Sequence, residues 1–283
     1  MITPLNEMTI KQENVYRKNK LWCHLHCHDL SQFDDIYLKY FERIKKYFNI
    51  IITFNVGNYN FCKENLVLLQ CTNRGYDIGP KFIAINYLNF KTIEFTFIFM
   101  LHSKSNTEKR KIYFDPFFQN LNEIVLSLND DIGVVVPAKM ILQVYRPLYR
   151  CPKRANTRWI YNKYHTDNLI TIMDLKPNNC IFPEGNVYIL HNQVANYLYD
   201  NRFDLYAKLN TKTSFDYNWF VHHYRLHLSY EDALKVYTKK KMYGNNMSVP
   251  TNEKQLADCM LEHAFERIIF CVCKKLNKNI LKI

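Results

Sequence analysis

Residues 66–88 read LVLLQCTNRGYDIGPKFIAINYL, and this stretch decides the fold. The apolar run from Leu66 to Cys71 is typical of a buried strand. It stops abruptly at 72–75 (TNRG), and Pro80 is placed to start a helix that runs to about Leu88. The stretch therefore predicts a strand, a tight loop and a helix, in that order.

The same alternation continues on both sides of this unit. Strands are expected over 22–27, 49–54, 95–101 and 132–137, helices over 32–48 and 114–128, and a polar loop over 102–110. This order predicts an α/β fold with a Rossmann-type, mostly parallel sheet flanked by helices. Ligands of such open sheets bind beyond the carboxyl ends of the strands. We therefore expect the loops after the first, third and fourth strands to carry the chemistry.

The pattern changes after about residue 140. Residues 145–165 are basic and aromatic without clear periodicity, and a strand is expected over 186–190. Helices are expected over 191–200, 216–240 and 253–276. No internal repeat and no linker rich in Pro, Gly or Ser separates the two parts. We predict one domain over 1–283, in which a helical second half (141–283) completes a cleft beside the first half (20–140).

The composition narrows the class of protein. With 283 residues, 48% of them hydrophobic, and only 6 glycines, the chain is excluded from the disordered and collagen-like classes. The net charge of +12 favours anionic partners such as phosphate, nucleic acid or acidic lipid. The nine cysteines are scattered and include no CxxC pair, which indicates reduced thiols and excludes a disulfide framework or a zinc ribbon.

The sequence carries no feature of secretion or membrane insertion. Its first 20 residues are polar, and no apolar run approaches the roughly 18 residues of a membrane span. We therefore expect a cytoplasmic protein. The abundance of Asn, Lys, Ile, Tyr and Phe is the bias of an AT-rich genome, such as that of some viruses.

The loop from Asn73 to Pro80 holds two of the six glycines at a junction between a strand and a helix. Glycine lets the backbone approach a ligand, and the free N–H groups of a helix N-terminus bind phosphate. Arg74 can pair with a diphosphate, and Asp77 can accept a hydrogen bond from a ribose or a base. The alternative is a tight turn in which Asp77 only caps the helix.

Two further segments carry groups suited to catalysis. His102-Ser103-Lys104-Ser105 follows the run FTFIFML, so a cation lies where it can neutralise a departing phosphate, unless the segment is only a solvated turn. In LEHAFERII, the polar residues Glu262, His263, Glu266 and Arg267 fall on an arc opposite an apolar stripe. A carboxylate there can act as a general base, and the alternative is an ordinary amphipathic helix with i,i+4 partners.

Two other functions remain open at this point. His24, His26 and His28 alternate along a strand and so face one side, as in a metal-dependent hydrolase, with His222, His223 and His227 as further ligands. Aromatic packing explains those last three equally well. A non-catalytic binder of polysaccharide or nucleic acid would use basic residues and aromatic rings, namely Trp159, Tyr161, Tyr164, Trp219 and Tyr224. No recognised nucleic-acid motif accompanies them.

Seven segments, in order, resemble the rhamnan synthesis protein F family of glycosyltransferases: HLHCHDL, NIIITF, NRGYDIGP, FMLHSKS, IGVVVP, FPEGNVYIL and LEHAFERII. They span about residues 22 to 270. The segment NRGYDIGP is the most specific, close to the family's NRGrDIGP. The chain departs from the family where Val187-Tyr188 replaces Met-Phe, and where the segment between FPEG and LEHAFER is longer.

This resemblance implies a GT-A-like fold and transfer of a sugar, rhamnose or a related deoxyhexose, from a UDP-, GDP- or dTDP-linked donor to a glycan acceptor. The half over 20–140 would bind the nucleotide sugar, and the half over 141–283 would receive the acceptor. By analogy with related GT-A enzymes, the transfer would invert the anomeric centre. No nucleic acid partner is expected, and the basic segment 273–278 is a candidate for peripheral membrane contact.

The resemblance also implies roles for individual residues. Asn73, Arg74, Asp77, Gly79, His102 and Lys104 would contact the donor, Glu262 or Glu266 would be the catalytic base, and His26, His263, Arg267 and Gly185 would support them. GT-A enzymes usually hold a divalent Mn or Mg ion through an Asp-x-Asp motif. Because the fourth strand here ends in LHSKS, we expect Lys104 and Arg74 to replace much of the role of that metal.

Overall fold

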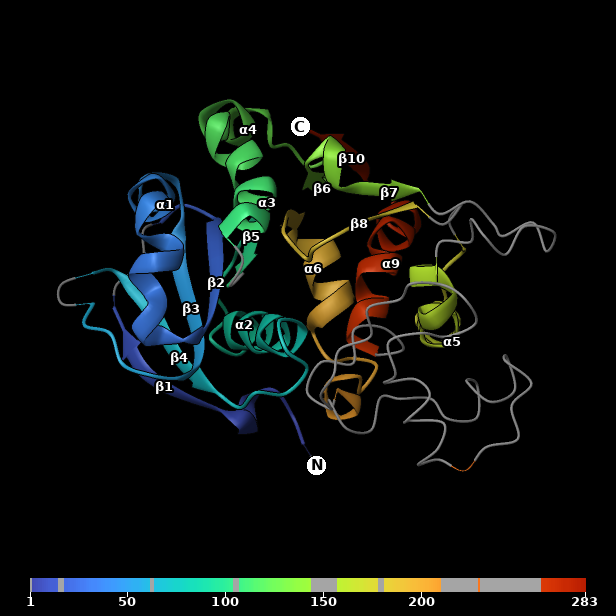
Figure 1. Cartoon of the computed structure of the whole chain (residues 1–283), viewed down its shortest axis with the longest axis horizontal. Coiled ribbons are helices and arrows are strands. Elements are labelled where there is room, and N and C mark those ends of the chain that lie inside the picture. Colours follow the sequence, from blue (N-terminus) through green and yellow to red (C-terminus); the bar gives the residue numbers. More distant parts are fainter. Residues whose placement is uncertain are drawn as a thin grey trace.

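The computed structural model describes residues 2–14, 18–61, 64–103, 107–143, 157–177, 181–209, 229 and 261–283. The central strands are β1 (Met8–Glu13), β2 (Leu21–Asp29), β3 (Asn49–Val56), β4 (Leu66–Cys71), β5 (Phe97–His102), β6 (Ile132–Val136), β9 (Tyr188–His191) and β10 (Asn279–Lys282). They form one sheet in the order β1-β4-β3-β2-β5-β9-β6-β10 (Figure 1). The short strands β7 (Ile141–Gln143) and β8 (Ile181–Pro183) pair separately.

The sheet is mixed and mostly parallel. The neighbours β4, β3, β2 and β5 run parallel, and β10 runs parallel to β6. β9 is antiparallel to both β5 and β6, and β1 is antiparallel to β4. The chain leaves β2 toward β3 and β4 and then returns to β5 on the other side of β2. This reversal creates a topological switch point, where open α/β sheets bind ligands, beyond the carboxyl ends of β2 and β5.

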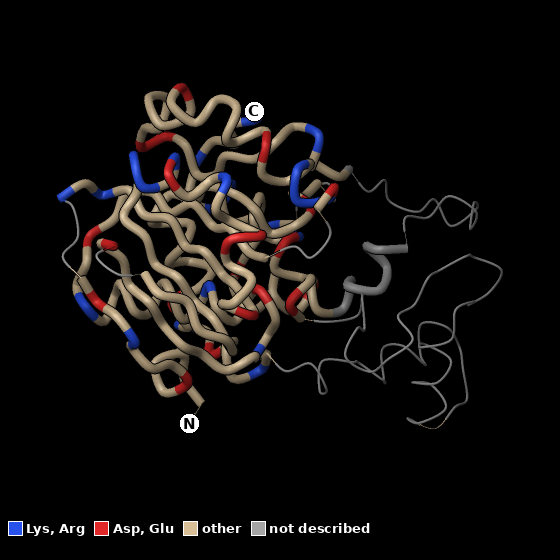
Figure 2. The backbone as a smooth tube through the Cα atoms, turned by 60° about the vertical axis from the view of Figure 1, so that its left-hand side comes forward, with Lys and Arg blue, Asp and Glu red and all other residues tan. Residues whose placement is uncertain are grey.

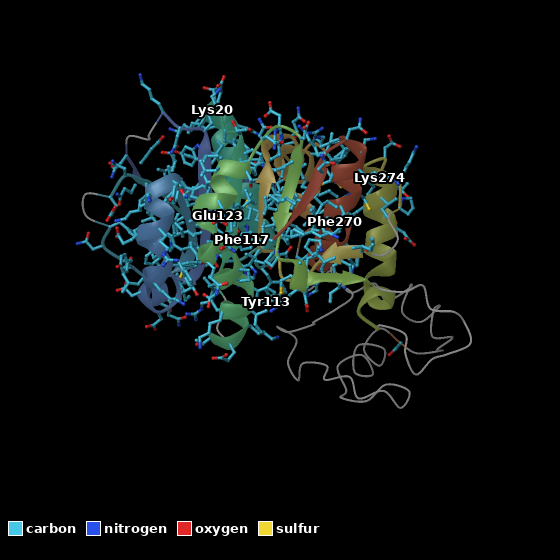
Figure 3. All side chains as sticks on the ribbon, turned by 90° about the horizontal axis from the view of Figure 1, so that it is seen from above. Lys20, Tyr113, Phe117, Glu123, Phe270 and Lys274 are labelled. Atoms are coloured by element: carbon cyan, nitrogen blue, oxygen red, sulfur yellow. The ribbon has the colours of Figure 1, made fainter. Side chains whose placement is uncertain are left out.

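Two layers of helices cover the sheet. The helices are α1 (Phe33–Tyr47), α2 (Ile78–Phe90), α3 (Thr107–Gln119), α4 (Leu121–Ser127), α5 (Thr157–Ile172), α6 (Asn192–Tyr199) and α9 (Leu261–Lys275). One hydrophobic core lies between the sheet and α1, α3 and α4, and the other between the sheet and α2, α6 and α9 (Figure 1). Seen from above, Phe117 and Phe270 lie in the interior, whereas Lys20 and Lys274 lie at the rim (Figure 3).

The buried strands explain why the sheet forms here. In β3, Ile50 and Ile52 belong to the α1 core, and Ile51 between them belongs to the α2 core. A strand that is covered on both faces needs a nearly continuous apolar run, and NIIITF supplies one in which Thr53 is the only polar residue after Asn49. The same holds for LVLLQC in β4, whose bounds agree with those expected from the sequence. The structure thus confirms an α/β fold with a mostly parallel sheet flanked by helices.

The helix expected over 114–128 was wrong in its bounds. The structure has two helices, α3 and α4, separated at Asn120, and α3 already begins at Thr107 inside the expected loop. The first turns of α3 are polar and mostly exposed, so they carry no apolar periodicity that would reveal a helix. At the other end of α3, Arg43 donates a hydrogen bond to the carbonyl oxygen of Phe118, which satisfies a terminal carbonyl of the helix.

Several elements lie where the sequence predicted none. β1 falls in the polar N-terminal segment, and α5 lies in and beyond the aperiodic segment 145–165. The chain after α9 continues as β10, so the second half adds a strand to the sheet besides β9, which lies close to the strand expected over 186–190. The helix expected over 216–240 lies outside the described residues.

Charged residues of both signs are interspersed along the described chain (Figure 2). Most of the excess of Lys and Arg over Asp and Glu falls in ranges that the structure does not describe, chiefly 144–156 and 210–260. A basic docking surface of the second half can therefore not be traced from the described residues. None of the described helices is both long and apolar enough to cross a membrane.

Candidate functional site

The switch point brings together segments that are far apart in the sequence. His26 of β2 and His102 of β5 are register partners on neighbouring strands, and both are buried. Nε2 of His102 lies 2.8 Å from the carbonyl oxygen of Gly185 and 3.4 Å from Oδ2 of Asp77. Gly185 lies just before β9, whose antiparallel course starts beside the end of β5. Three expected site segments, at Asp77, His102 and Gly185, thus meet at one place.

Asp77 occupies the N-cap position of α2, but its side chain makes no capping hydrogen bond. The carboxylate is directed instead toward His102. Burial lowers the pKa of His26 to about 4, and the nearby Asp77 carboxylate opposes that shift. The alternative in which Asp77 serves only as a helix cap is therefore wrong, since this carboxylate interacts with two histidines of the sheet.

The helix α9 contributes two carboxyl groups to the same region. Oε1 of Glu266 accepts a hydrogen bond of 3.1 Å from the backbone N–H of Gly185. Glu262 is only 1% exposed, and within the described part of the chain neither of its carboxyl oxygens has a hydrogen-bond partner. Burial raises the pKa of Glu262 to about 7, and the Asp77 carboxylate adds to this rise. A carboxyl group that titrates near neutrality is suited to general acid–base chemistry.

The first turns of α9 are not those of an ordinary amphipathic surface helix. Glu262 and Arg267 are both buried, although the sequence pattern assigned them to the polar arc. The guanidinium of Arg267 lies 4.8 Å from the ring centroid of Phe182 in β8 and donates to the carbonyl oxygen of His263. Arg267 therefore helps to attach α9 to β8.

Lys81 is a residue of this region that the sequence analysis missed. Its ammonium is completely buried and donates hydrogen bonds to the carbonyl oxygen of Asn186 (2.7 Å) and the hydroxyl of Tyr188 (2.8 Å). Gly185 and Asn186 both have positive φ, 96° and 55°, so the turn that binds His102 and Glu266 needs such support. The available signal was the position of Lys81, one helical turn after Asp77 in an otherwise apolar helix.

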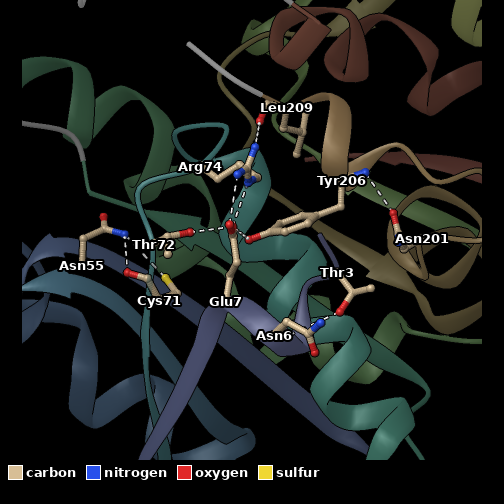
Figure 4. A network of polar contacts seen from close by, with 10 residues as sticks. All are labelled: Thr3, Asn6, Glu7, Asn55, Cys71, Thr72, Arg74, Asn201, Tyr206 and Leu209. Atoms are coloured by element: carbon tan, nitrogen blue, oxygen red, sulfur yellow. Dashed lines mark hydrogen bonds and ion pairs between the residues drawn. The ribbon is translucent and has the colours of Figure 1, made fainter. Parts of the chain in front are cut away.

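Arg74, expected as a donor contact, binds the protein itself (Figure 4). Its Nε and Nη2 donate to the two carboxylate oxygens of Glu7 at 2.8 and 3.0 Å, and its Nη1 donates to the carbonyl oxygen of Leu209 at 2.9 Å. Glu7 also accepts hydrogen bonds from the hydroxyls of Thr72 and Tyr206. This network joins the N-terminal segment, the 72–79 loop and the chain near 206–209, and it occupies all three nitrogens of the guanidinium.

We expect Glu7→Gln to lower the free energy of unfolding by about 1–2 kcal/mol at pH 7, because the Arg74 guanidinium loses its charged acceptor. The hydrogen bonds with Arg74 lower the pKa of Glu7 in the folded protein. The stabilisation is therefore complete above the ordinary glutamate pKa and is lost as the pH falls through the lowered folded value. Urea unfolding of the wild type and of Glu7→Gln between pH 3 and 7 measures how the free energy of unfolding of each protein depends on pH.

The exposed Glu123 on α4 offers a matched control for this substitution, since Glu123→Gln leaves the network intact. The difference in the free energy of unfolding between wild type and Glu7→Gln should become smaller toward pH 3. Glu123→Gln should have the same free energy of unfolding as wild type at every pH. A gap for Glu7→Gln that stays constant over the whole range would contradict an ionic contribution of Glu7.

The remaining expected site residues are spread over several environments. Asn73 is exposed in the loop before α2, and Gly79 is the second residue of that helix. A Cβ on Gly79 would stand 1.8 Å from the carbonyl oxygen of Arg74, so the loop can fold back over the helix only because this residue is glycine. Lys104 lies outside the described residues, as do Trp219, Tyr224 and the side chains of Trp159, Tyr161 and Tyr164.

The histidines of β2 make hydrogen bonds to β3, and they form no metal cluster with other residues that the structure describes. Nε2 of His24 and Nδ1 of His26 both contact the hydroxyl of Thr53, and Nδ1 of His28 contacts Oδ1 of Asn55. Among the described residues, no group of three or more His, Cys, Asp or Glu side chains is arranged to hold a metal ion. The further ligands suggested for a hydrolase, His222, His223 and His227, lie outside that part of the chain.

Comparison with known proteins adds no assignment to this geometry. No family model matches the chain, and neither a curated protein nor a solved structure matches it significantly. The residues at the switch point and the motifs that contain them are therefore the basis for inferring its function.

Proposed function

We propose that this chain is a glycosyltransferase with a GT-A-like fold, which moves a sugar, rhamnose or a related deoxyhexose, from a nucleoside diphosphate to a glycan acceptor. The observation that carries the proposal is Glu262, a buried carboxyl group with a pKa raised to about 7, in the electrostatic field of Asp77. Asp77 acts on Glu262, His102 contacts Asp77, and Gly185 contacts His102 and Glu266. These three residues come from the motifs that carry the family resemblance. Asp77 belongs to NRGYDIGP, His102 to FMLHSKS and Gly185 to FPEGNVYIL.

In the proposed reaction, Glu262 acts as the base. The acceptor hydroxyl gives its proton to the Glu262 carboxylate, and the acceptor oxygen forms a bond to the anomeric carbon. The bond between that carbon and the diphosphate oxygen breaks, and its electron pair leaves with the nucleoside diphosphate. Attack from the face opposite the leaving group inverts the anomeric centre. At a pKa of about 7, the carboxylate is both available at neutral pH and basic enough to assist this transfer.

The leaving diphosphate needs positive charge and hydrogen-bond donors in the same place. His102 lies at the carboxyl end of the sheet, and Lys104 follows β5 in the sequence. The start of α2 does not supply the free N–H groups expected from the sequence, because those of Ile78 and Gly79 donate to the carbonyl oxygen of Gly75 and Pro80 has none. Asp77 is suited to accept a hydrogen bond from the ribose or the base. Arg74 is not part of this set in our proposal, because Glu7 and Leu209 hold its guanidinium, and it serves to fix the loop that carries Asp77.

A thermal-shift screen tests the proposal directly. Purified protein is heated with UDP-, GDP- and dTDP-linked sugars, each with and without Mn²⁺, and with the corresponding free sugars as controls. A ligand at about 100 times its Kd should stabilise the fold by about 2.7 kcal/mol, which is readily seen as a higher Tm. We expect at least one nucleotide sugar to do so and the free sugars to have no effect.

Two outcomes of this screen would count against the proposal. If no nucleotide sugar raises the Tm, the transferase assignment fails. If binding occurs only with Mn²⁺ and EDTA abolishes it, the protein's own cations do not replace the metal, contrary to what we expected from the sequence. That expectation is then wrong, and the proposal that the protein binds a nucleotide sugar stands.

A further inference from the structure

A buried hydroxyl links two histidines beneath the candidate site. Oγ1 of Thr53 lies 2.7 Å from Nε2 of His24 and 3.1 Å from Nδ1 of His26. Thr53 and His24 are completely buried, and His26 is 4% exposed. Burial lowers the pKa of His24 well below its ordinary value and that of His26 to about 4, so both imidazoles are neutral at pH 7. The three side chains form a continuous chain of hydrogen bonds across β2 and β3.

Such a chain can run in only two directions. The Thr53 hydroxyl has one hydrogen and, among the described residues, no partner besides these two histidines, so it donates to one of them and accepts from the other. A neutral imidazole has one N–H and one bare nitrogen. In the forward direction, His24 donates from Nε2 to Thr53, and Thr53 donates to Nδ1 of His26, whose own hydrogen is then on Nε2. In the reverse direction, His26 donates from Nδ1, and its Nε2 is bare.

Two observations favour the forward direction. Nδ1 of His24 is buried and has no hydrogen-bond partner among the described residues. In the reverse direction this nitrogen would carry a hydrogen, and a buried donor without an acceptor is rarer than a buried acceptor without a donor. In addition, once His24 donates to Thr53, the hydrogen of this hydroxyl has no acceptor among the described residues other than Nδ1 of His26.

We propose that Thr53 and His24 fix His26 as the tautomer with its hydrogen on Nε2, which makes His26 a permanent hydrogen-bond donor to an anionic oxygen at the switch point. Because this deepens the proposed function, on which it rests, the anionic oxygen is one of the donor diphosphate. Nδ1 is already occupied by Thr53, so Nε2 is the nitrogen that can meet a ligand. His26 is then a binding residue, and Thr53 and His24 are positioning residues that act through it.

The tautomer is measured by long-range ¹H–¹⁵N NMR on protein labelled with ¹⁵N-histidine, at pH 7.5. In the wild type, we expect His26 to show a protonated Nε2 and a bare Nδ1. Thr53→Val keeps the shape of the side chain but removes the hydroxyl, so we expect a mixture of the two tautomers, and Thr53→Ser should restore the single form. A wild-type His26 with its hydrogen on Nδ1 would overturn the proposal, whether or not the valine variant folds.

The ligand is tested with inorganic pyrophosphate as the probe. We expect titration to shift the Nε2 signal of His26 in the wild type and in Thr53→Ser, with about tenfold weaker binding in Thr53→Val. If nucleotide sugars stabilise the protein but the Nε2 signal does not respond to pyrophosphate, the role of His26 is wrong and the proposed function stands. If the tautomer and the pyrophosphate response are as expected but no nucleotide sugar binds, the transferase assignment fails and the anion-binding role of His26 stands.

Discussion

Glu262→Gln is expected to lower the rate of sugar transfer by about 10²- to 10⁴-fold, the usual contribution of a general base. The amide has nearly the same shape as the carboxyl group but cannot accept the acceptor's proton. Because Glu262 is not assigned to the donor, the rise in Tm caused by a nucleotide sugar should remain. Turnover and thermal shift, measured on the same preparations, separate loss of chemistry from loss of binding.

The same substitution should make the fold more stable at pH 8. The folded carboxyl keeps its proton up to about pH 7, whereas the unfolded one ionises near 4.5, so the wild type loses stability as the pH rises between these values. The difference between the two pKa values corresponds to a loss of about 3 kcal/mol in the free energy of unfolding, and glutamine does not suffer this loss because it does not ionise. Urea unfolding at pH 4 and pH 8 should therefore show a gain for Glu262→Gln only at the higher pH.

The pH profile of the wild type supplies an independent measurement. The value of kcat/KM should rise with pH up to about 7, as Glu262 loses its proton, and then level off. Glu123→Gln, on the exposed face of α4, is the control and should change neither turnover nor stability. If Glu262→Gln retains near-normal turnover, the base lies elsewhere, and Glu266 is the first residue to examine.

Gly79→Ala is expected to destabilise the protein by about 3 kcal/mol, at the upper end for overpacking. Helix propensity alone predicts the opposite sign, since alanine is better than glycine inside a helix by about 1 kcal/mol. The steric overlap should outweigh this gain in helix propensity, because the new Cβ would stand 1.8 Å from the backbone oxygen of Arg74. A backbone atom cannot rotate away as a side chain can. The loop that carries Asp77 must move, so we also expect the nucleotide-sugar thermal shift to be lost.

Gly133→Ala in β6 is a matched control for this prediction. There the added Cβ would meet mainly side-chain atoms, from Lys278 and Cys273, and the site lies on other strands. Some stability should be lost, but the nucleotide-sugar thermal shift should remain. Chemical denaturation combined with the thermal-shift assay measures both effects, and a stabilised Gly79→Ala protein would show that the loop is not packed as described.

The parallel half of the sheet could be predicted because burial on both faces leaves a clear trace in the sequence. β3 and β4 are mainly apolar runs, and a turn sequence ends the second of them. β1 and β10 leave no such trace, since they are edge strands with largely exposed side chains that are held by backbone hydrogen bonds to β4 and β6. Their existence depends on partners that are distant in the sequence, so local patterns cannot reveal them.

The residues of the candidate site likewise divide into those with a signal in the local sequence and those without one. Asp77 could be found because it lies in a glycine-containing loop between an apolar strand and a helix, His102 because it ends an apolar strand, and Glu262 because it lies in a helix of regular pattern. The pairing of Arg74 with Glu7 could not be, because it joins residues 67 positions apart through the tertiary fold. Lys81 was missed for the same reason, since its acceptors, Asn186 and Tyr188, follow more than 100 residues later.

The edge strand β10 also constrains how the protein is made. Among the described strands it pairs only with β6, so residues 279–282 must emerge from the ribosome long after Ile132–Val136 before this edge can close. Until then, the backbone of β6 presents unpaired donors and acceptors, which is the feature that draws nascent chains into aggregates. The amides of β6 and β10 should therefore gain their protection late in synthesis, and this edge is where a chaperone would bind the growing chain.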